Sequence, residues 1–244
     1  QQRQKYLELQ GRLDLSEFDG LFDAINDVEE KQVIDLPEHF VSLCNKHLPL
    51  RSKGAMAYLQ SRGITKKEIL KWKIGYCQGG KYGGRIIIPS FNHSGDCNYF
   101  IARSYVGHHR RYLNPPCGRD IIFNELNIDW DEPIVLVEGV FDAIVAGDNA
   151  IPILGSTLRE ESKLFQAIAI HDTPVYIALD PDAEKKAYWI IRSLMKYDLE
   201  IKKLNIGTYE DIGSMSRKVF QEKLQNAEDV DGDLYFLERQ LRNL

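Results

Sequence analysis

Hydrophobic and polar positions in the second half of the chain follow a pattern typical of a sheet covered by helices on both faces. Short apolar runs alternate with stretches of helical spacing from residue 133 to residue 226. This alternation predicts a parallel β-sheet. We expect strands at 134–138, 150–154, 175–180 and 200–206, and helices at 141–147, 158–170, 183–197 and 215–226.

The first half mixes short helices with strands that turn back on themselves. Gly63 ends one predicted helix, and Thr65 with Glu68 forms a capping box for the next. We therefore predict an α/β protein in which an α+β subdomain precedes the parallel sheet. The expected helices are 37–46, 54–62 and 66–71, and the expected strands are 85–89, 98–105 and 110–113. The predicted divisions are a helical lead-in at 1–50, a basic subdomain at 51–132, the parallel-sheet subdomain at 133–226 and a helical tail at 227–244.

Charge is distributed unevenly over a chain whose net charge is −5. Residues 51–120 carry 13 Lys and Arg against 3 Asp and Glu, whereas residues 121–244 carry 13 against 23. A basic block beside an acidic half favours a polyanion-binding surface next to an acidic site, although solvated charges clustered by chance would give the same counts.

Other sequence features narrow the class of protein. No apolar run approaches the roughly 18 residues of a membrane span, and the start resembles no signal peptide. We expect a cytoplasmic protein without a membrane partner, and an internal fragment because the chain opens without Met. No two of its four cysteines are close enough to suggest a zinc site or a disulfide framework.

Carboxylates follow two of the predicted parallel strands. Glu138 closes the first strand, Asp180 closes the third, and Asp182 comes two residues later. Parallel strands end at one edge of a sheet, so these side chains could converge on a cation, and oxygen ligands suit Mg²⁺ or Mn²⁺. The alternative is that Asp180 or Asp182 caps the helix that begins near residue 183.

These acids lie in motifs that resemble the TOPRIM family. Glu138-Gly139 with Phe141-Asp142-Ala143, and then Ala178-Leu179-Asp180-Pro181-Asp182, are similar to its signature. Asp211 matches the first acid of a third motif, and Gly213 stands where the second acid is expected. Leu154-Gly155-Ser156-Thr157 resembles the turn after the second strand of primases, and it could equally be a helix cap.

The basic block extends the resemblance to DnaG-type primases. The similar segments follow the family order from about residue 55 to residue 226. They are 58–64, 74–76, 84–89, 100–103, 110–115 and 123–126. The resemblance implies an RNA polymerase core that makes RNA primers on single-stranded DNA from ribonucleoside triphosphates, with a replicative helicase as partner. It also implies that any zinc lies in a module outside this chain, and the economy of the chain suggests a phage or mobile element.

The resemblance assigns roles to individual residues. Glu138, Asp180 and Asp182 would be catalytic, and together with Asp211 they would hold Mg²⁺ or Mn²⁺. Glu138 could instead act as a general base, and Asp142 would be structural or support the ligands from behind. Nucleotide or template would contact Arg85, Arg103, Arg110, Arg111, Tyr112, Asn114, Gly155, Ser156 and Thr157. Two alternatives remain: a TOPRIM nuclease or topoisomerase-like enzyme, and a degenerate primase that binds single-stranded DNA or a helicase.

Overall fold

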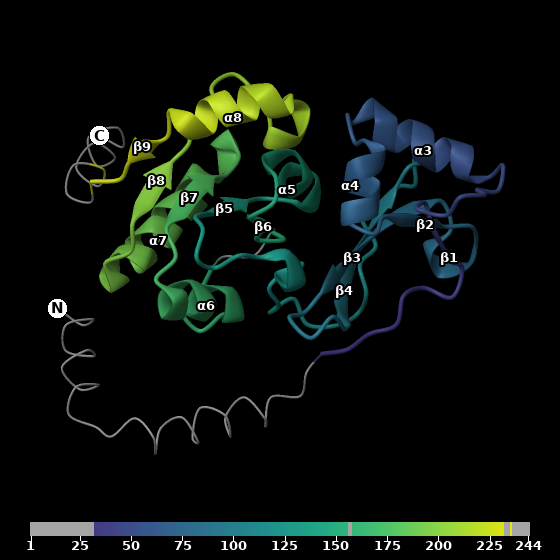
Figure 1. The fold of residues 1–244 in the computed structure, drawn as a ribbon, viewed down its shortest axis with the longest axis horizontal. Coiled ribbons are helices and arrows are strands. Elements are labelled where there is room, and N and C mark those ends of the chain that lie inside the picture. Colours follow the sequence, from purple (N-terminus) through teal and green to yellow (C-terminus); the bar gives the residue numbers. More distant parts are fainter. Residues whose placement is uncertain (1–31, 156–157, 232–234, 236–244) are drawn as a thin grey trace, which may run out of the picture.

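The computed structural model of the 244-residue chain describes residues 32–155, 158–231 and 235. These residues fold around two β-sheets that lie side by side (Figure 1). None of the described helices is both long and apolar enough to cross a membrane. Most of the predicted lead-in and tail, together with Ser156 and Thr157, lie outside the described residues.

The first sheet is antiparallel and has the order β1-β2-β3-β4. Helices α3 and α4 lie between β1 and β2 in the chain and bury Ala55, Leu59 and Ile69 in the core. The capping box of α4 is confirmed, because the Thr65 backbone N–H donates to Oε2 of Glu68 at 2.6 Å. The elements are β1 (Phe40–Ser42), α3 (Ser52–Ser61), α4 (Lys66–Lys71), β2 (Gly75–Cys77), β3 (Arg85–Phe91) and β4 (Cys97–Ser104).

Two predictions for this half are wrong. Residues 37–46 do not form a helix, because Phe40 and Val41 pair with Cys77 and Tyr76 in the sheet. The first sheet therefore begins before the predicted boundary at residue 51. Residues 110–113 form no strand and contribute only a bridge between Tyr112 and Arg103. Pairing with distant residues decided both outcomes, and local spacing carries no information about such pairing.

The second sheet has the order β6-β5-β7-β8-β9, with every neighbouring pair parallel except β8 and β9. Figure 1 shows α5 and α8 on one side of the sheet and α6 and α7 on the other. The elements are β5 (Ile134–Val137), α5 (Val140–Ala146), β6 (Ala150–Pro152), α6 (Lys163–His171), β7 (Val175–Ala178), α7 (Glu184–Leu194), β8 (Ile201–Lys203), α8 (Arg217–Gln225) and β9 (Glu228–Asp229). The predicted α/β fold class is confirmed.

Several boundaries of this half differ from prediction, and β8 is shorter than the strand predicted at 200–206. Helix α6 begins at Lys163 and not at residue 158, because Ser162 caps it by accepting from the Phe165 backbone N–H at 3.4 Å. Strand β9 occupies the start of the segment predicted as a helical tail. It pairs with β8, which satisfies the backbone groups on the outer side of that strand.

Alternate residues of β5 point into two different hydrophobic cores. Ile134 and Leu136 pack with α6 and α7, whereas Val135 and Val137 pack with α5 and α8. The second of these cores continues into the first sheet, where it includes Tyr76 of β2. The two sheets are therefore joined by shared apolar packing.

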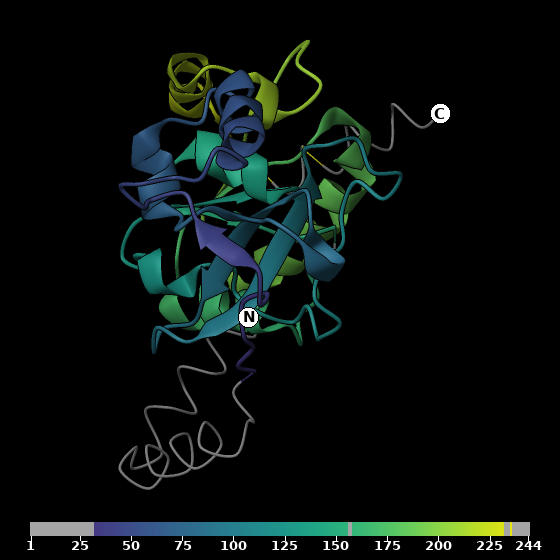
Figure 2. The same cartoon turned by 90° about the vertical axis from the view of Figure 1, so that its right-hand side faces the viewer.

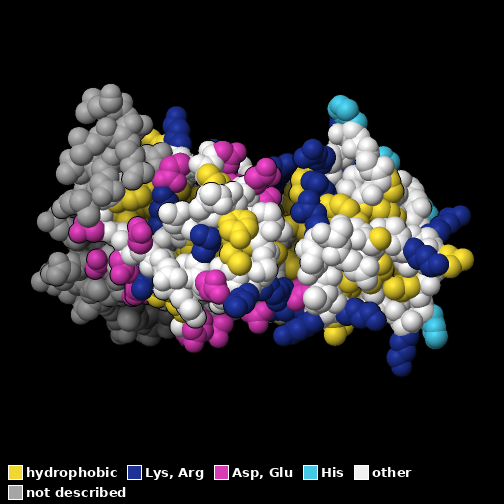
Figure 3. All heavy atoms as spheres, turned by 90° about the horizontal axis from the view of Figure 1, so that it is seen from above, with side chains coloured by type: hydrophobic (Ala, Val, Ile, Leu, Met, Phe, Trp, Pro, Cys, Tyr) yellow, Lys and Arg dark blue, Asp and Glu magenta, His cyan; other side chains and the backbone are white. Residues whose placement is uncertain are grey.

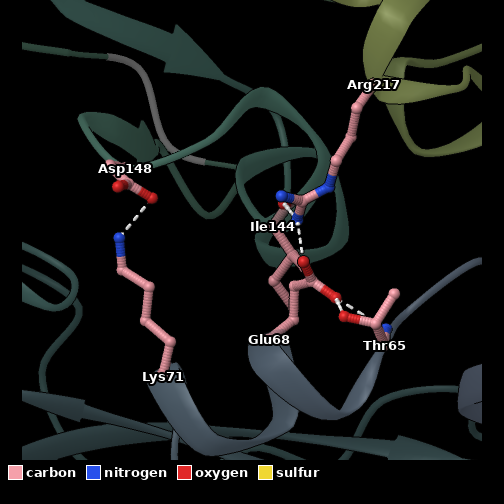
Figure 4. Close-up of polar contacts among 6 residues, drawn as sticks. All are labelled: Thr65, Glu68, Lys71, Ile144, Asp148 and Arg217. Atoms are coloured by element: carbon pink, nitrogen blue, oxygen red, sulfur yellow. Dashed lines mark hydrogen bonds and ion pairs between the residues drawn. The ribbon is translucent and has the colours of Figure 1, made fainter.

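Polar contacts reinforce this junction at α4, as Figure 4 shows. Arg217 of α8 lies 2.8 Å from Oε1 of Glu68 and also donates to the carbonyl oxygen of Ile144 at 2.7 Å. Lys71 forms an ion pair with Asp148. In Figure 2, α3 and α8 both lie at the top of the molecule.

Candidate active site

The strand ends of β5 and β7 bring three acids to one pocket. The two strands are neighbours, with Val137 opposite Ala178, so the residues that follow them leave the sheet at the same edge. Glu138, Asp180 and Asp182 line an open pocket of about 500 Å³ at this edge. The remaining lining residues come from the start of α7 and the turn before it, and they are Ala183, Lys185, Lys186 and Trp189.

Asp180 lies at the centre of a concentration of negative charge. Burial, followed by the charges of Asp142, Glu138, Asp211 and Asp182, raises the pKa of Asp180 to about 7. Its Oδ1 atom is buried and has no hydrogen-bond partner among the described residues. A buried carboxylate oxygen without a partner is unfavourable unless a cation or a donor satisfies it.

Glu138 is already paired with a cation from the chain itself. The ammonium group of Lys186 lies 2.9 Å from both carboxylate oxygens of Glu138. The two side chains are largely buried, with exposed fractions of 24% for Lys186 and 17% for Glu138. The lysine therefore neutralises one of the carboxylates of the pocket.

Asp142 binds backbone groups behind the pocket. Its carboxylate accepts from the backbone N–H groups of Gly139 at 2.9 Å and Gly213 at 2.8 Å. Burial raises its pKa to about 6, with contributions from the charges of Asp211 and Glu138. These contacts agree with the structural role predicted for Asp142.

Gly213 leaves no space for the acid expected at that position. A Cβ atom at residue 213 would lie 2.9 Å from Oδ1 of Asp142, closer than real Cβ atoms come to another heavy atom. Asp211 remains near the pocket, but its Oδ1 accepts from the Ser214 backbone N–H at 2.7 Å and caps the turn at 212–214.

The acids of the pocket fit a hard divalent cation. Their ligand atoms are all oxygens, as Mg²⁺ and Mn²⁺ prefer. Oδ1 of Asp180 has no hydrogen-bond partner among the described residues, so its lone pairs are available to a metal. No group of three or more His, Cys, Asp or Glu side chains within the described ranges is arranged to hold a metal as it stands. Binding would require carboxylates to move toward one another, and the metal would compete with Lys186 for Glu138.

Two predicted ligand-binding residues of the basic block, Arg85 and Asn114, bind backbone groups in this structure. Arg85 is buried, and its guanidinium group donates to the carbonyl oxygens of Arg110 at 2.9 Å, Arg111 at 3.2 Å and Ala102 at 3.4 Å. Oδ1 of Asn114 accepts from the Ala102 backbone N–H at 3.3 Å. These contacts fix the 110–114 segment against β4, and phosphate binding by Arg85 stays a prediction.

Other residues of the block remain open to a ligand. Arg110 and Arg111 are exposed, and the Tyr112 ring is 47% exposed. The Arg103 guanidinium lies 4.7 Å from the centre of the Tyr112 ring. Gly155 adopts a positive φ of 71° next to the undescribed Ser156 and Thr157.

A chain of arginine and aromatic contacts connects this surface to α5. The Tyr58 hydroxyl accepts from Nε of Arg103 at 3.0 Å and from Nε of Arg62 at 2.9 Å. Arg62 lies 4.8 Å from the centre of the Phe141 ring, and Phe141 precedes Asp142 on α5. Seen from above in Figure 3, acidic side chains gather over the second sheet, and Lys and Arg over the junction and the first sheet.

Sequence reasoning missed several members of the site. Lys186 and Trp189 lie four and seven residues after Asp182. On a helix this spacing returns both residues to the side of Asp182, so the sequence could have predicted them. Tyr58 and Arg62 carry no such signal, because their role depends on contacts with Arg103 and Phe141, which belong to other elements.

An antiparallel sheet beside a helix-covered parallel sheet, with acids at the shared strand edge, defines the fold of a DnaG-type primase catalytic core. The DnaG primase catalytic domain bound to single-stranded DNA has this fold, with a TM-score of 0.63 and 17% identity over 77% of this chain and 75% of that one. A DNA primase domain from Pseudomonas aeruginosa matches with a TM-score of 0.62 and 20% identity, over 81% of this chain and 78% of that one.

The sequence is similar to a DNA primase of Thermotoga maritima. The two are 24% identical over 191 residues, which is 70% of this chain and 34% of the relative. The chain thus spans about a third of the length of this curated relative. The zinc-binding and RNA polymerase domains of the Aquifex aeolicus primase match with a TM-score of 0.64 and 20% identity, over 78% of this chain and 60% of that one. The sequence matches no protein-family model. The resemblance to DnaG-type primases that the motifs predicted is confirmed.

Proposed function

We propose that this chain is the catalytic core of a DNA primase, which joins ribonucleotides into a primer on a single-stranded DNA template. The observation that carries the proposal is the pocket at the ends of β5 and β7, where Asp180 has an unpaired buried oxygen beside Glu138 and Asp182. A carboxylate cluster of this kind, within a DnaG-type fold, suits divalent-metal nucleotidyl transfer.

In this proposal the parallel-sheet subdomain is a TOPRIM domain. Glu138, Asp180 and Asp182 would hold Mg²⁺ or Mn²⁺, with Asp211 as a further ligand once it leaves the Ser214 backbone. The bound metal would neutralise the triphosphate of the incoming nucleotide and the charge that develops on the leaving pyrophosphate. The protein's part is to place these carboxylates at one strand edge, which the pairing of β5 with β7 achieves.

The surface around Arg103 and Tyr112 would receive the nucleic acid. Exposed guanidinium groups of Arg110 and Arg111 can bind phosphates, and the half-exposed Tyr112 ring can stack on a base. Arg85 and Asn114 would act indirectly, by fixing the backbone of this segment. Roles for Gly155, Ser156 and Thr157 in nucleotide binding, a helicase partner, a cytoplasmic location and a phage or mobile-element origin remain part of the proposal.

The decisive experiment is primer synthesis on single-stranded DNA with labelled ribonucleotides and either Mg²⁺ or Mn²⁺. We expect short RNA products from the parent chain and none from Asp180→Asn or Glu138→Gln. Glu222→Gln, which removes an exposed acid of α8, is the matched control and should keep full activity. Labelled DNA incubated without nucleotides provides the opposite test, because shortening of the DNA would indicate a nuclease and overturn the proposal.

A further inference from the structure

The pocket wall formed by α7 supplies a cation that the proposed mechanism has not used. Lys186 comes from the first turn of α7, and its ammonium group bonds to both oxygens of Glu138 at 2.9 Å. Both side chains are mostly shielded from water, so these charge-assisted bonds are stronger than those of an exposed surface pair. A metal that approaches Glu138 in this arrangement therefore meets a cation that is already bonded to both oxygens.

Asp180 and Glu138 are in opposite states within the same pocket. Oδ1 of Asp180 has no partner among the described residues, whereas both oxygens of Glu138 bind Lys186. A divalent cation that joins the two carboxylates would come close to this ammonium group at the Glu138 oxygens, so the two cations compete for Glu138. Two cations of like charge cannot share these oxygens closely without a large electrostatic cost.

We propose that Lys186 is a positioning residue that exchanges partners: it holds Glu138 before the divalent cation binds, and it moves to the nucleotide triphosphate afterwards. The inference rests on the metal site of the proposed function and adds that the Lys186 ammonium group competes with the metal for Glu138. Lysine suits this exchange because its charge is a compact group at the end of a flexible stem. The displaced ammonium remains on the wall of the same 500 Å³ pocket, where metal-bound phosphate oxygens would come within its reach.

The first test is a titration of the metal-free chain with Mn²⁺ in the absence of nucleotide. Electron paramagnetic resonance measures the Mn²⁺ that stays free in solution. Lys186→Met should bind Mn²⁺ roughly three- to tenfold more tightly than the parent, because the internal competitor is removed. Lys186→Arg keeps the charge and the pair, so its affinity should stay near that of the parent. Lys185→Met is the matched control, since Lys185 lines the same pocket and has no bond to Glu138 in the described structure.

The second test is binding of ATP in the presence of saturating Mn²⁺, measured by calorimetry. Here Lys186→Met should bind several-fold more weakly than the parent, which is the opposite direction from its effect on the metal. A purely structural role would weaken both affinities together. Circular dichroism melting of each variant checks that the fold is retained.

The results separate this inference from the proposed function. If the parent binds Mn²⁺ and Lys186→Met binds it no more tightly, or no more tightly than Lys185→Met does, the exchange is overturned while the metal site stands. If neither the parent nor Lys186→Met binds Mn²⁺, the metal site fails, and the proposed function and the exchange fail with it.

Discussion

Arg217 and Glu68 lie 149 positions apart in the sequence and form an ion pair of 2.8 Å across the junction of the two sheets. Glu68 is almost fully buried, with 7% of its side chain exposed, whereas Arg217 is 46% exposed. The same Glu68 carboxylate caps α4 through Thr65. This one carboxylate therefore connects the start of α4 to α8. The contact helps to fix the first sheet, with its basic block, against the second sheet, which carries the acidic pocket.

Replacing Arg217 with Met should destabilise the protein by about 1–3 kcal/mol, because it leaves the Glu68 charge buried without its partner and frees the Ile144 carbonyl. Urea unfolding followed by circular dichroism measures this free energy. Lys218→Met is the matched control: Lys218 is the next residue, and its exposed pair with Glu222 is worth at most about 0.5 kcal/mol. Equal effects of the two substitutions would contradict the assigned role of Arg217.

The metal-free protein should lose stability as the pH rises from about 4 to 7. Burial and neighbouring carboxylates raise the pKa of Asp180 to about 7, and burial raises that of Asp142 to about 6, from an ordinary value of 3.8. Between about pH 4 and 7 the folded state thus binds more protons than the unfolded state, so stability falls with rising pH. We expect the Tm to drop on the order of a few degrees, as measured by scanning calorimetry.

Two comparisons identify the source of this pH effect. The Asp180→Asn variant should show a flatter profile, because the amide does not titrate. Added Mg²⁺ should restore the Tm at pH 8, since a ligand that binds the folded state stabilises it. A parent Tm that rises between about pH 4 and 7 without metal would refute the assignment.

Gly213→Ala should destabilise the protein by about 1–2 kcal/mol, because its Cβ atom would lie 2.9 Å from Oδ1 of Asp142. The substitution would also disturb the bond from the Gly213 backbone N–H to that carboxylate. Gly79→Ala is a suitable control, since a Cβ atom there meets only His39, at an ordinary 3.8 Å. Chemical denaturation of both variants decides whether close approach to Asp142 requires glycine.

Arg85→Met and Arg111→Met should affect different properties of the protein: the first its stability, the second its binding to single-stranded DNA. Arg85→Met removes the hydrogen bonds that the Arg85 guanidinium group donates to the carbonyl oxygens of Arg110 and Arg111. We expect this loss to lower the free energy of unfolding by about 2 kcal/mol. The exposed Arg111 should contribute little to stability. Its loss should weaken binding to single-stranded DNA and reduce the salt dependence of log K by about 0.7 for one phosphate contact.

Thermal unfolding and fluorescence anisotropy at several salt concentrations distinguish the two arginines. An Arg85→Met variant as stable as the parent would show that its backbone contacts are dispensable. An Arg111→Met variant with unchanged DNA affinity at all salt concentrations would remove Arg111 from the proposed binding surface.

The sequence by itself determined the parallel sheet and the sheet edge at which the acids that follow its strands lie. Apolar runs of strand length alternate with helical spacing, and an acid follows each of two such runs. Once the strands are parallel, their ends must share an edge, so the local pattern allowed Glu138, Asp180 and Asp182 to converge, and the resemblance to TOPRIM motifs favoured a shared site over helix capping. The capping box of Thr65 and Glu68 was readable for the same reason, because both partners lie within one turn.

Only the tertiary structure decided which distant groups satisfy one another. Phe40 and Val41 became a strand because β2 was available to pair with them, and Arg85 binds the backbone because three carbonyls surround its guanidinium group. Likewise, Lys186 binds Glu138 across 48 positions of sequence. Charge and burial at these positions depend on neighbours that only folding brings together, and no local spacing specifies them.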